Sequence, residues 1–209
     1  MVYLCATPHS GGSAVGRRGL DGVESWNWPS NSTINVLCFA NCPEVELTLN
    51  GKSIGARKCS EAVNGIISWH VPYEPGTLEA VGRDNGRELC EFTLKTAGPP
   101  ARIELLPDTP SLHADGKDIC HVEFRILDAN GVRVPDANPE VTFELSGMAA
   151  LLGLGNGDLS DPETGKTNSH HAFQGHGLAI LQSTMVPGSI TLKATAPGLE
   201  PASVSLQSQ

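Results

Sequence analysis

The sequence predicts an all-β protein built from two tandem antiparallel β-sandwiches. Short segments in which apolar and polar residues alternate are separated by turn signals about every ten residues, which is typical of sandwiches. No long stretch combines an apolar period of 3.6 residues with helix-forming side chains. The chain has 23 glycines and 15 prolines among 209 residues, and 18% of its residues are charged, which suits a turn-rich β protein.

The clearest local pattern is a hairpin centred on Asn50 and Gly51. Val45, Leu47 and Leu49 alternate with polar residues before it, so a strand there would bury one face. Asn-Gly readily takes positive φ at both central positions of a type I′ turn, and a second run of strand-forming residues follows. The other segments of the chain repeat this design.

The first half of the chain continues with short strands after an irregular start. Residues 10–22 are rich in Gly and Ser, so we expect residues 1–24 to be a mobile lead-in. In a later strand Ile67, Trp69 and Val71 share one face, which places Trp69 in the core. Strands are expected at residues 33–40, 65–71, 77–82 and 88–95.

A domain boundary is expected where the strand pattern breaks. Residues 96–100 read Thr-Ala-Gly-Pro-Pro. Two prolines cannot donate ladder hydrogen bonds, and the glycine adds conformational freedom. We therefore expect the first domain at residues 1–97 and the second at 98–209.

The second half repeats the strand pattern around one long interruption. Cys120, Val122, Phe124 and Ile126 alternate with polar residues and are expected to face inward. Residues 153–177 look like a long polar loop, and a loop of that length is usually functional or mobile. Strands are expected at residues 101–106, 119–127, 141–145, 178–183, 190–196 and 203–206.

Charge and hydropathy argue against two classes of partner. The net charge of -9 disfavours nucleic acid and anionic membranes, because both reward a basic surface. No run is long and apolar enough to span a bilayer. The first residues lack a basic region followed by an apolar one, so we expect no signal peptide in this chain. Six cysteines are spread without a Cys-x-x-Cys motif, which favours mostly free thiols.

Several motifs together resemble a known family. The sequences Trp-Asn-Trp-Pro at 26–29 and Asn-Gly-Lys-Ser-Ile-Gly at 50–55 resemble the Ig-like module that follows the catalytic barrel in glycoside hydrolase family 2 β-galactosidases. Gly-Leu-Gly-Asn-Gly-Asp at 153–158 and Ala-Phe-Gln-Gly at 172–175 resemble the C-terminal module of the same enzymes. The resemblance covers nearly everything after Ser25. Residues 10–24 depart from the family, in which an apolar strand leads directly to the Trp-Asn-Trp motif.

The resemblance implies a fold, a role and a partner. The fold would be two tandem Ig-like antiparallel β-sandwich domains. The chain would be a non-catalytic C-terminal region of a β-galactosidase-like O-glycosyl hydrolase, bracing the catalytic domain or mediating domain or oligomer contacts. Two alternatives stay open: a carbohydrate-binding module, and an Ig-like segment of a bacterial surface adhesin. The Asp-Ala-Asn-Gly motif at 128–131 is also common in repeats of such adhesins.

No catalytic residues are predicted in this chain. Retaining glycosidases need two carboxyl groups about 5 Å apart on a scaffold that holds both against the sugar. The family's acid/base motif places Glu directly after Asn, whereas here Asn138-Pro139-Glu140 has another order and lies in a turn. No barrel and no nucleophile elbow are visible.

Two tryptophans are candidate carbohydrate-binding residues. Trp26 and Trp28 lie on one side of an extended segment, and an aromatic face can stack on a sugar ring. An oligosaccharide is therefore a candidate partner. The competing interpretation is that both rings pack inside the module or against a missing catalytic domain.

The long polar loop holds candidate metal ligands. Asp158, Asp161 and Glu163 could supply oxygen ligands to Ca²⁺, but their spacing differs from an EF-hand, and a solvated polar loop is the favoured interpretation. A separate histidine group could bind a transition metal, but no supporting residues are evident in the sequence. No other cofactor is expected. The histidines of that group are His170, His171 and His176.

Overall fold

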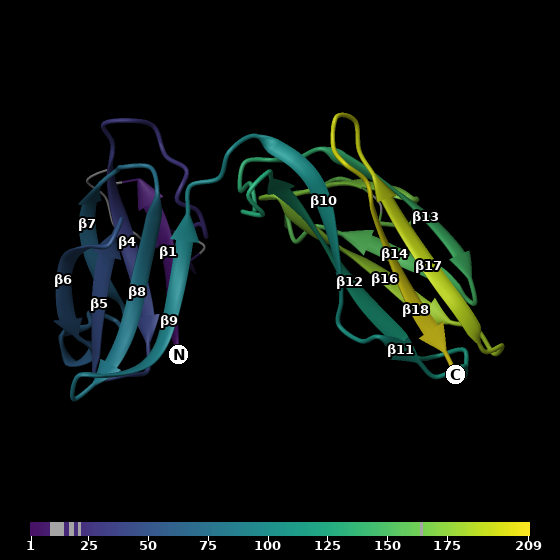
Figure 1. The fold of residues 1–209 in the computed structure, drawn as a ribbon, viewed down its shortest axis with the longest axis horizontal. Helices are drawn as coiled ribbons and strands as arrows, with labels where there is room; N and C mark the ends of the chain where they lie inside the picture. The colour runs from purple at the N-terminus through teal and green to yellow at the C-terminus, as the bar shows by residue number, and fades with distance from the viewer. Residues whose placement is uncertain (9–14, 17–18, 21, 164) are drawn as a thin grey trace. The chain divides into compact units, whose positions relative to one another are not determined.

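The computed structural model describes residues 1–8, 15–16, 19–20, 22–163 and 165–209. The chain divides into two compact units, Met1–Thr96 (unit 1) and Ala97–Gln209 (unit 2). Each unit contains two main β-sheets (Figure 1). The described helical structure is one 3-10 turn at Cys59–Glu61, and none of it is long and apolar enough to span a membrane.

Unit 1 is a sandwich of a three-stranded and a four-stranded sheet. The strand orders are β1-β4-β7 and β6-β5-β8-β9, and all neighbouring strands pair antiparallel. A separate pair, β2 and β3, is two residues long on each side. The strands are β1 (Val2–Pro8), β2 (Val15–Gly16), β3 (Gly19–Leu20), β4 (Thr33–Ala40), β5 (Glu44–Leu49), β6 (Lys52–Lys58), β7 (Ile67–Pro72), β8 (Thr77–Asp84) and β9 (Arg87–Lys95).

Two tight hairpins set the register of the four-stranded sheet. Asn50 and Gly51 join β5 to β6 with φ of 52° and 75°, and Asn85 and Gly86 join β8 to β9 with φ of 48° and 82°. Positive φ at both central residues defines the type I′ geometry that matches strand twist. The hairpin predicted at Asn50-Gly51 is confirmed, and Asn85-Gly86 forms a second hairpin of the same kind.

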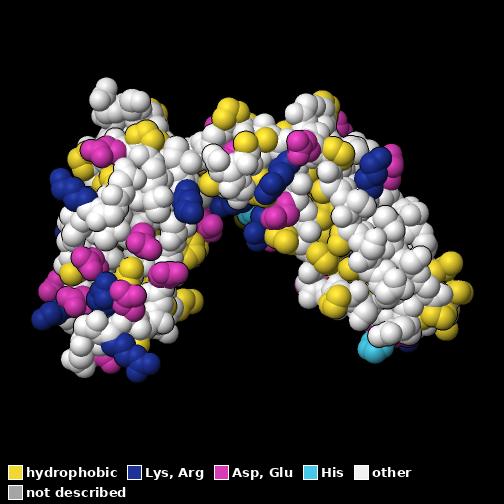
Figure 2. All heavy atoms as spheres, in the orientation of Figure 1, with side chains coloured by type: hydrophobic (Ala, Val, Ile, Leu, Met, Phe, Trp, Pro, Cys, Tyr) yellow, Lys and Arg dark blue, Asp and Glu magenta, His cyan; other side chains and the backbone are white. Residues whose placement is uncertain are grey.

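The core of unit 1 lies between these sheets. Val45, Leu47, Ile67, Trp69 and Val71 are all at most 4% exposed, so the predicted inward faces are confirmed. On the outer face of β5, β8 and β9, acidic and basic side chains are intermixed (Figure 2). Apolar residues on one side and charged ones on the other are what an alternating strand requires.

The expected mobile lead-in is wrong for the first eight residues. Strand β1 pairs along its full length with β4, and Val2, Leu4 and Ala6 are buried in the core. The apolar alternation in this segment is short, but burial of these three side chains is enough to hold β1 as the edge strand of the sheet. Most of residues 10–22 lie outside the described part of the chain.

The six cysteines are free thiols, and five of them belong to unit 1. Cys38 is fully buried, and burial raises its pKa to about 12 because the charged thiolate is disfavoured. Burial also raises the pKa of Cys5 and of Cys42. In unit 2, burial raises the pKa of Cys120 to about 11.

Unit 2 is a larger sandwich of a four-stranded and a five-stranded sheet. The strand orders are β10-β12-β16-β14 and β11-β18-β17-β13-β15, with β11 and β18 running parallel and the other pairs antiparallel. The strands are β10 (Pro100–Pro107), β11 (Ser111–Leu112), β12 (Ile119–Asp128), β13 (Glu140–Gly147), β14 (Ala149–Gly155), β15 (Ser169–His171), β16 (His176–Ser183), β17 (Gly188–Thr195) and β18 (Ala202–Ser208).

The core of unit 2 confirms the predicted alternation of β12. Cys120, Val122, Phe124 and Ile126 are each 0% exposed. Phe124 meets Phe143 of β13 edge-on, with ring centroids 5.2 Å apart, which joins the two sheets.

The predicted loop at 153–177 is wrong in part, because it contains strand structure. Strand β14 runs to Gly155, β15 occupies Ser169–His171, and β16 begins at His176. Strand β15 lies at a sheet edge and is held by pairing with β13, where Val141 faces His170. Its Ser-His-His sequence carries no apolar alternation, so the strand depends on tertiary pairing rather than on a local pattern.

The chain is anchored on both sides of the boundary between the units. The Thr96 N–H donates to the Gly76 carbonyl at 2.9 Å, and its hydroxyl donates to the Trp26 carbonyl at 2.8 Å, both within unit 1. The Gly98 N–H donates to the Asp128 carboxylate at 2.8 Å, within unit 2.

Asp128 is a buried carboxylate that organises the turn after β12. It is 1% exposed and also accepts the N–H groups of Asn130 and Val132 at 2.8 Å. Burial alone would raise the pKa of Asp128, but the hydrogen bonds from Gly98, Val132 and Asn130 hold it below its usual range. The Asp-Ala-Asn-Gly motif thus serves the fold of unit 2.

Candidate functional site

Trp26, the first candidate carbohydrate-binding residue, is part of the core of unit 1. Its ring is 0% exposed and meets Tyr73 edge-on at a centroid distance of 5.5 Å. The indole N–H donates to the Glu74 carbonyl at 3.0 Å. Trp26 therefore offers no ring face to a sugar, and its predicted carbohydrate role is wrong because packing uses the whole indole.

The other two tryptophans occupy different environments. Trp28 is partly buried against the same core, and its indole N–H donates to the Ser25 carbonyl at 3.3 Å. Its role in sugar binding stays a prediction. Trp69 is 3% exposed, and its indole N–H donates to the Gly55 carbonyl at 3.2 Å. The Arg57 guanidinium carbon lies over the Trp69 ring, 5.6 Å from the ring centroid. The prediction that Trp69 is a core residue is confirmed.

The acidic loop between β14 and β15 brings together two of the three predicted metal ligands. Single ligand atoms of Asp161, Glu163 and His170 lie within 4.8 Å of one another. Asp158 lies outside this cluster, because its carboxylate accepts the backbone N–H and the hydroxyl of Ser160 at 2.8 and 2.7 Å. The structure thus groups Asp161 and Glu163 with His170 and leaves Asp158 out of the predicted set, and metal binding stays a prediction.

His170 is the buried member of this cluster, with 3% exposure. Its Nδ1 lies 3.1 Å from the His171 carbonyl oxygen and 3.3 Å from Glu163 Oε2, and its Nε2 lies 3.5 Å from Asp161 Oδ2. Both nitrogens of the ring therefore face oxygen acceptors.

Glu163 is fixed by the neighbouring histidine. Its Oε2 accepts the backbone N–H of His171 at 3.0 Å, and its Oε1 contacts Nδ1 of the His171 ring. These hydrogen bonds hold the pKa of Glu163 below its usual range. Glu163 is consequently a carboxylate, and not a carboxylic acid, at neutral pH.

Asn156 connects the cluster to the rest of unit 2 and was missed by the sequence reasoning. The side chain is 8% exposed, and its amide group donates to Asp161 Oδ2 at 2.8 Å and to the His171 carbonyl at 3.1 Å. Its oxygen accepts the Asp158 N–H at 2.9 Å. A lone Asn between two glycines was the available signal.

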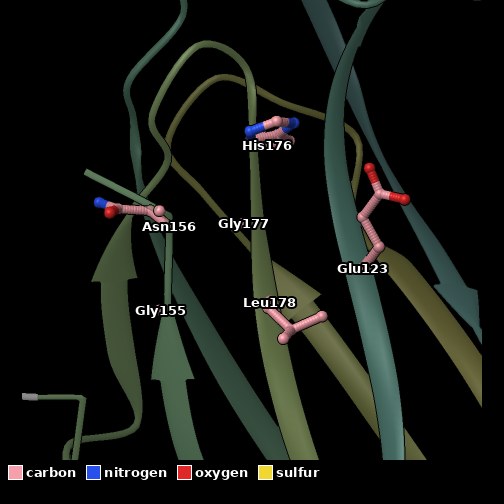
Figure 3. A pocket seen from close by; sticks show the side chains of 7 residues that line it. Glu123, Gly155, Asn156, His176, Gly177 and Leu178 are labelled. Carbon is pink, nitrogen blue, oxygen red and sulfur yellow. The ribbon is translucent and has the colours of Figure 1, made fainter. Parts of the chain in front are cut away.

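A surface hollow of about 360 Å³ lies beside this loop (Figure 3). The glycine at position 177 is required there, because a Cβ would lie 2.3 Å from Phe124 Cζ. The sequence reasoning did not single out the hollow, since its members come from three strands and a loop. It is lined by Glu123, Gly155, Asn156, Gly157, His176, Gly177 and Leu178.

Glu123 supplies the charge of the hollow. Its two oxygens accept Nε–H and Nη2–H of Arg125, both at 2.7 Å. These bonds hold the pKa of Glu123 below its usual range, with burial opposing them. The charge of nearby His176 acts in the same direction. The hollow thus presents an ionised carboxylate and an imidazole.

Comparison with protein families separates the two units. Residues 103–205 match glycoside hydrolase family 2 C-terminal domain 5. Residues 31–90 match a domain of unknown function, DUF4982.

Curated relatives and solved structures match both units. The chain is 37% identical to the β-galactosidase BoGH2A of Bacteroides ovatus, over 88% of this chain and 22% of that protein. It is 31% identical to a β-galactosidase of Thermoanaerobacter pseudethanolicus, over 76% of this chain and 22% of the relative. A solved glycosyl hydrolase family 2 member from Bacteroides cellulosilyticus is similar with a TM-score of 0.85 and 28% identity, over all of this chain and 28% of that one. The chain thus spans about a fifth of the length of these curated relatives.

Proposed function

Because this chain belongs to glycoside hydrolase family 2, we propose that it is a non-catalytic C-terminal region of a larger β-galactosidase-like O-glycosyl hydrolase. The observation that carries the proposal is the extent of the match. It covers 88% of this chain but only 22% of the β-galactosidase of Bacteroides ovatus. Such a region acts by packing against the catalytic domain and bracing it.

The carboxylates support a non-catalytic role. Retaining glycosidases use two carboxyl groups about 5 Å apart, one of which has a raised pKa and acts as the acid. Asp161 and Glu163 come within 4.8 Å, but the pKa of Glu163 is lowered by hydrogen bonds from His171. Both carboxylates also face His170 or its neighbours rather than an open cleft.

One end of unit 2 offers a surface for such bracing, here called the end patch, made of Ile119, Met148, Met185 and Val186. These side chains are 41%, 37%, 74% and 54% exposed. The Thr184 N–H donates to the Met148 carbonyl at 3.1 Å, which brings the β13–β14 turn and the β16–β17 turn together. Clustered exposed apolar side chains mark interaction sites, and the partner we propose here is the catalytic domain.

Two experiments test this proposal. The purified chain should not hydrolyse nitrophenyl β-galactoside or β-glucuronide, and turnover that is lost in Glu163→Gln would contradict a non-catalytic role. Deleting the matching region from the β-galactosidase of Bacteroides ovatus should shorten the half-life of its activity on heating. Adding this chain in trans should restore part of that half-life, and Met185→Lys should restore less. Equal half-lives with and without the region would exclude bracing.

A carbohydrate-binding role is the second candidate, and it rests on the hollow. The ionised Glu123 and the imidazole of His176 are groups that hydrogen-bond sugar hydroxyls. Isothermal titration with galactose and glucuronate tests it. Saturable heat that disappears in Glu123→Gln would support it, and heat of dilution alone would exclude it.

A further inference from the structure

We infer that Cys42 and Cys90 of unit 1 are a redox modification site, at which a small disulfide oxidises the two thiols to one intramolecular disulfide bond. The site is independent of the proposed function. In the structure both residues are free thiols. Cys42 lies in the connection from β4 to β5, and Cys90 lies in β9. The bond would therefore link that connection to an edge strand of the four-stranded sheet of unit 1 and stabilise the unit.

The two sulfur atoms border the same small space beside a glycine. Gly82 of β8 is buried and lies directly opposite Cys90 in the register of β8 and β9. A Cβ added to Gly82 would lie 2.6 Å from Cys42 Sγ and 2.9 Å from Cys90 Sγ. Because glycine has no side chain, nothing from this residue stands between the sulfurs. Rotation about the Cα–Cβ bond of each cysteine can then bring them to the bonding distance of about 2.05 Å.

The two thiols differ in their access to solvent. Cys42 is 4% exposed, and its thiol donates to the Glu44 carbonyl at 3.4 Å. Cys90 is only partly buried and lies in the edge strand of its sheet. A dissolved oxidant can therefore reach Cys90 first, and Cys42 is the buried thiol that completes the bond.

A third thiol, Cys59, is the competing partner of Cys42. Its backbone N–H donates to the Pro43 carbonyl at 2.8 Å, which places it at the open end of the β5–β6 hairpin. The atoms nearest to a Cβ on Gly82 belong to Cys42, Val2 and Cys90, so the space opens between Cys42 and Cys90. We assign the bond to this pair for that reason.

The arrangement of the thiols suits a disulfide better than a thiolate metal centre. Structural zinc sites use four ligands, and several thiolates must approach one another closely to share an ion. Among the residues that the structure describes, no three sulfurs lie within 4.8 Å of one another. A bond between two thiols needs no third ligand.

The oxidant is a low-molecular-weight disulfide, and the exchange takes two steps. The Cys90 thiolate attacks one sulfur of the small disulfide, which expels one small thiolate and leaves a mixed disulfide on Cys90. Cys42 then loses its proton to water and attacks Cys90 Sγ, which expels the second small thiolate. The two expelled thiolates take up two protons, as many as the two protein thiols release. One S–S bond of the oxidant is thus replaced by one S–S bond of the protein.

Burial makes the second step dependent on pH. Burial raises the pKa of the Cys42 thiol, and the nearby thiols of Cys59 and Cys90 act in the same direction. The thiolate is the nucleophile, so the bond should form faster as pH rises from neutral toward that pKa.

The decisive experiment treats the native full chain with oxidised glutathione in mildly alkaline buffer. The remaining thiols are then alkylated, and the chain is digested with trypsin without reduction. Cleavage after Lys and Arg separates the peptides that carry residues 42, 59 and 90, so mass spectrometry identifies the partners. We expect one cross-linked pair that carries Cys42 and Cys90, and the number of free thiols should fall by two.

Three variants assign the cross-link. Cys90→Ser should abolish it, and Cys59→Ser is the matched control that should keep it. Cys42→Ser should also abolish it, which is needed because Cys38 lies on the same tryptic peptide as Cys42. Circular dichroism checks that each variant is folded.

The oxidised wild-type chain should show a higher urea midpoint in tryptophan fluorescence, because a cross-link constrains the unfolded chain. Dithiothreitol should reverse this rise. The inference is overturned if the folded wild type keeps all its thiols under this oxidant, or if Cys42 is linked to Cys59. A cross-link that persists in folded Cys90→Ser, or an unchanged urea midpoint after oxidation, would also overturn it.

Discussion

Units 1 and 2 share the sandwich architecture but differ in the chemistry of what they bury. The described core of unit 1 contains Trp26, Trp69 and buried thiols, with Ser25 as its buried polar residue. Unit 2 buries several polar side chains, and some of them are ionisable. The buried polar residues of unit 2 are Asp128, Asn156, His170, Ser183 and Ser208.

The difference corresponds to the connections in the two units. Unit 1 joins β5 to β6 and β8 to β9 with two-residue Asn-Gly loops, which need no buried support. In unit 2 the connections that follow β12 and β14 are longer, and Asp128 and Asn156 satisfy backbone N–H and carbonyl groups in or next to them. Apolar burial thus stabilises the first unit, whereas the second also depends on buried hydrogen bonds that order its loops.

The largest effect is expected from Trp26→Ala, which removes a fully buried indole from unit 1. The substitution should cost about 3–5 kcal/mol of unfolding free energy. Tryptophan fluorescence measures it, because all three tryptophans lie in unit 1 and two remain in the variant. Trp28→Ala is the control and should cost less, since that ring is partly buried. Equal losses in the two variants would contradict the comparison.

The corresponding loss in unit 2 is expected from Asp128→Ala. Three backbone N–H groups lose their acceptor, and the free energy of unfolding of unit 2 should fall by about 3 kcal/mol. Far-UV circular dichroism in urea should show it, while the fluorescence transition of unit 1 stays in place. Asp158→Ala is the control and should lower the stability of unit 2 less, because that carboxylate is not buried and accepts hydrogen bonds only from its neighbour Ser160. A shift of the fluorescence transition would show that the units unfold together.

Extremes of pH should destabilise the two units to different extents, with smaller effects than these substitutions. Asp108, Asp115, Glu123 and Asp128 of unit 2 have lowered pKa values. A lowered carboxyl pKa stabilises the fold above the unfolded value, and this contribution is lost as pH falls through the folded pKa. Acid below about pH 4 should therefore lower the urea midpoint of unit 2 first.

Alkali should act mainly on unit 1. Cys38 keeps its proton up to a pKa of about 12, whereas an unfolded thiol ionises near 9.0. Stability is thus complete below pH 9.0 and falls as pH rises toward 12, and the raised pKa values of Cys5 and Cys42 add to the effect. Cys120 gives unit 2 a single contribution of this kind. A fluorescence midpoint that does not move between pH 8 and pH 10.5 would contradict this assignment.

The smallest expected effect is that of sugars on tryptophan emission. Trp26 and Trp69 are at most 3% exposed, so only Trp28 can report binding in unit 1. Galacto-oligosaccharides should leave the tryptophan emission unchanged, because the Trp28 indole N–H already donates to the Ser25 carbonyl. Saturable quenching that is lost in a folded Trp28→Ala variant would instead make unit 1 a sugar-binding unit.

Much of the fold was predictable because its signals are local. Alternation in β7 and β12 and the Asn-Gly turns specify buried faces and hairpins without knowledge of distant residues. Strands β14 and β15 were missed because their sequences do not alternate clearly, and pairing with β16 and β13 holds them.

The candidate site was predictable only in its acidic half. Asp161 and Glu163 are close in sequence, but His170 reaches them through the pairing of β15 with β13, about thirty residues away. Neither a local motif nor composition encodes that register. The same reason explains why Trp26 was ambiguous, since its burial depends on Tyr73 and Thr96 far along the chain.

Backbone hydrogen bonds anchor Thr96 in unit 1 and Gly98 in unit 2, on the two sides of the boundary, and Ala97 between these two residues is 8% exposed. A protease must draw several consecutive residues into extended form before it can cut. The boundary resists this, because Thr96 and Gly98 are anchored only two positions apart, although its composition of Gly and Pro suggests an accessible linker. Limited proteolysis should therefore leave the chain uncut near Thr96 and Gly98. The two units should then be prepared by expressing each one separately rather than by cleavage.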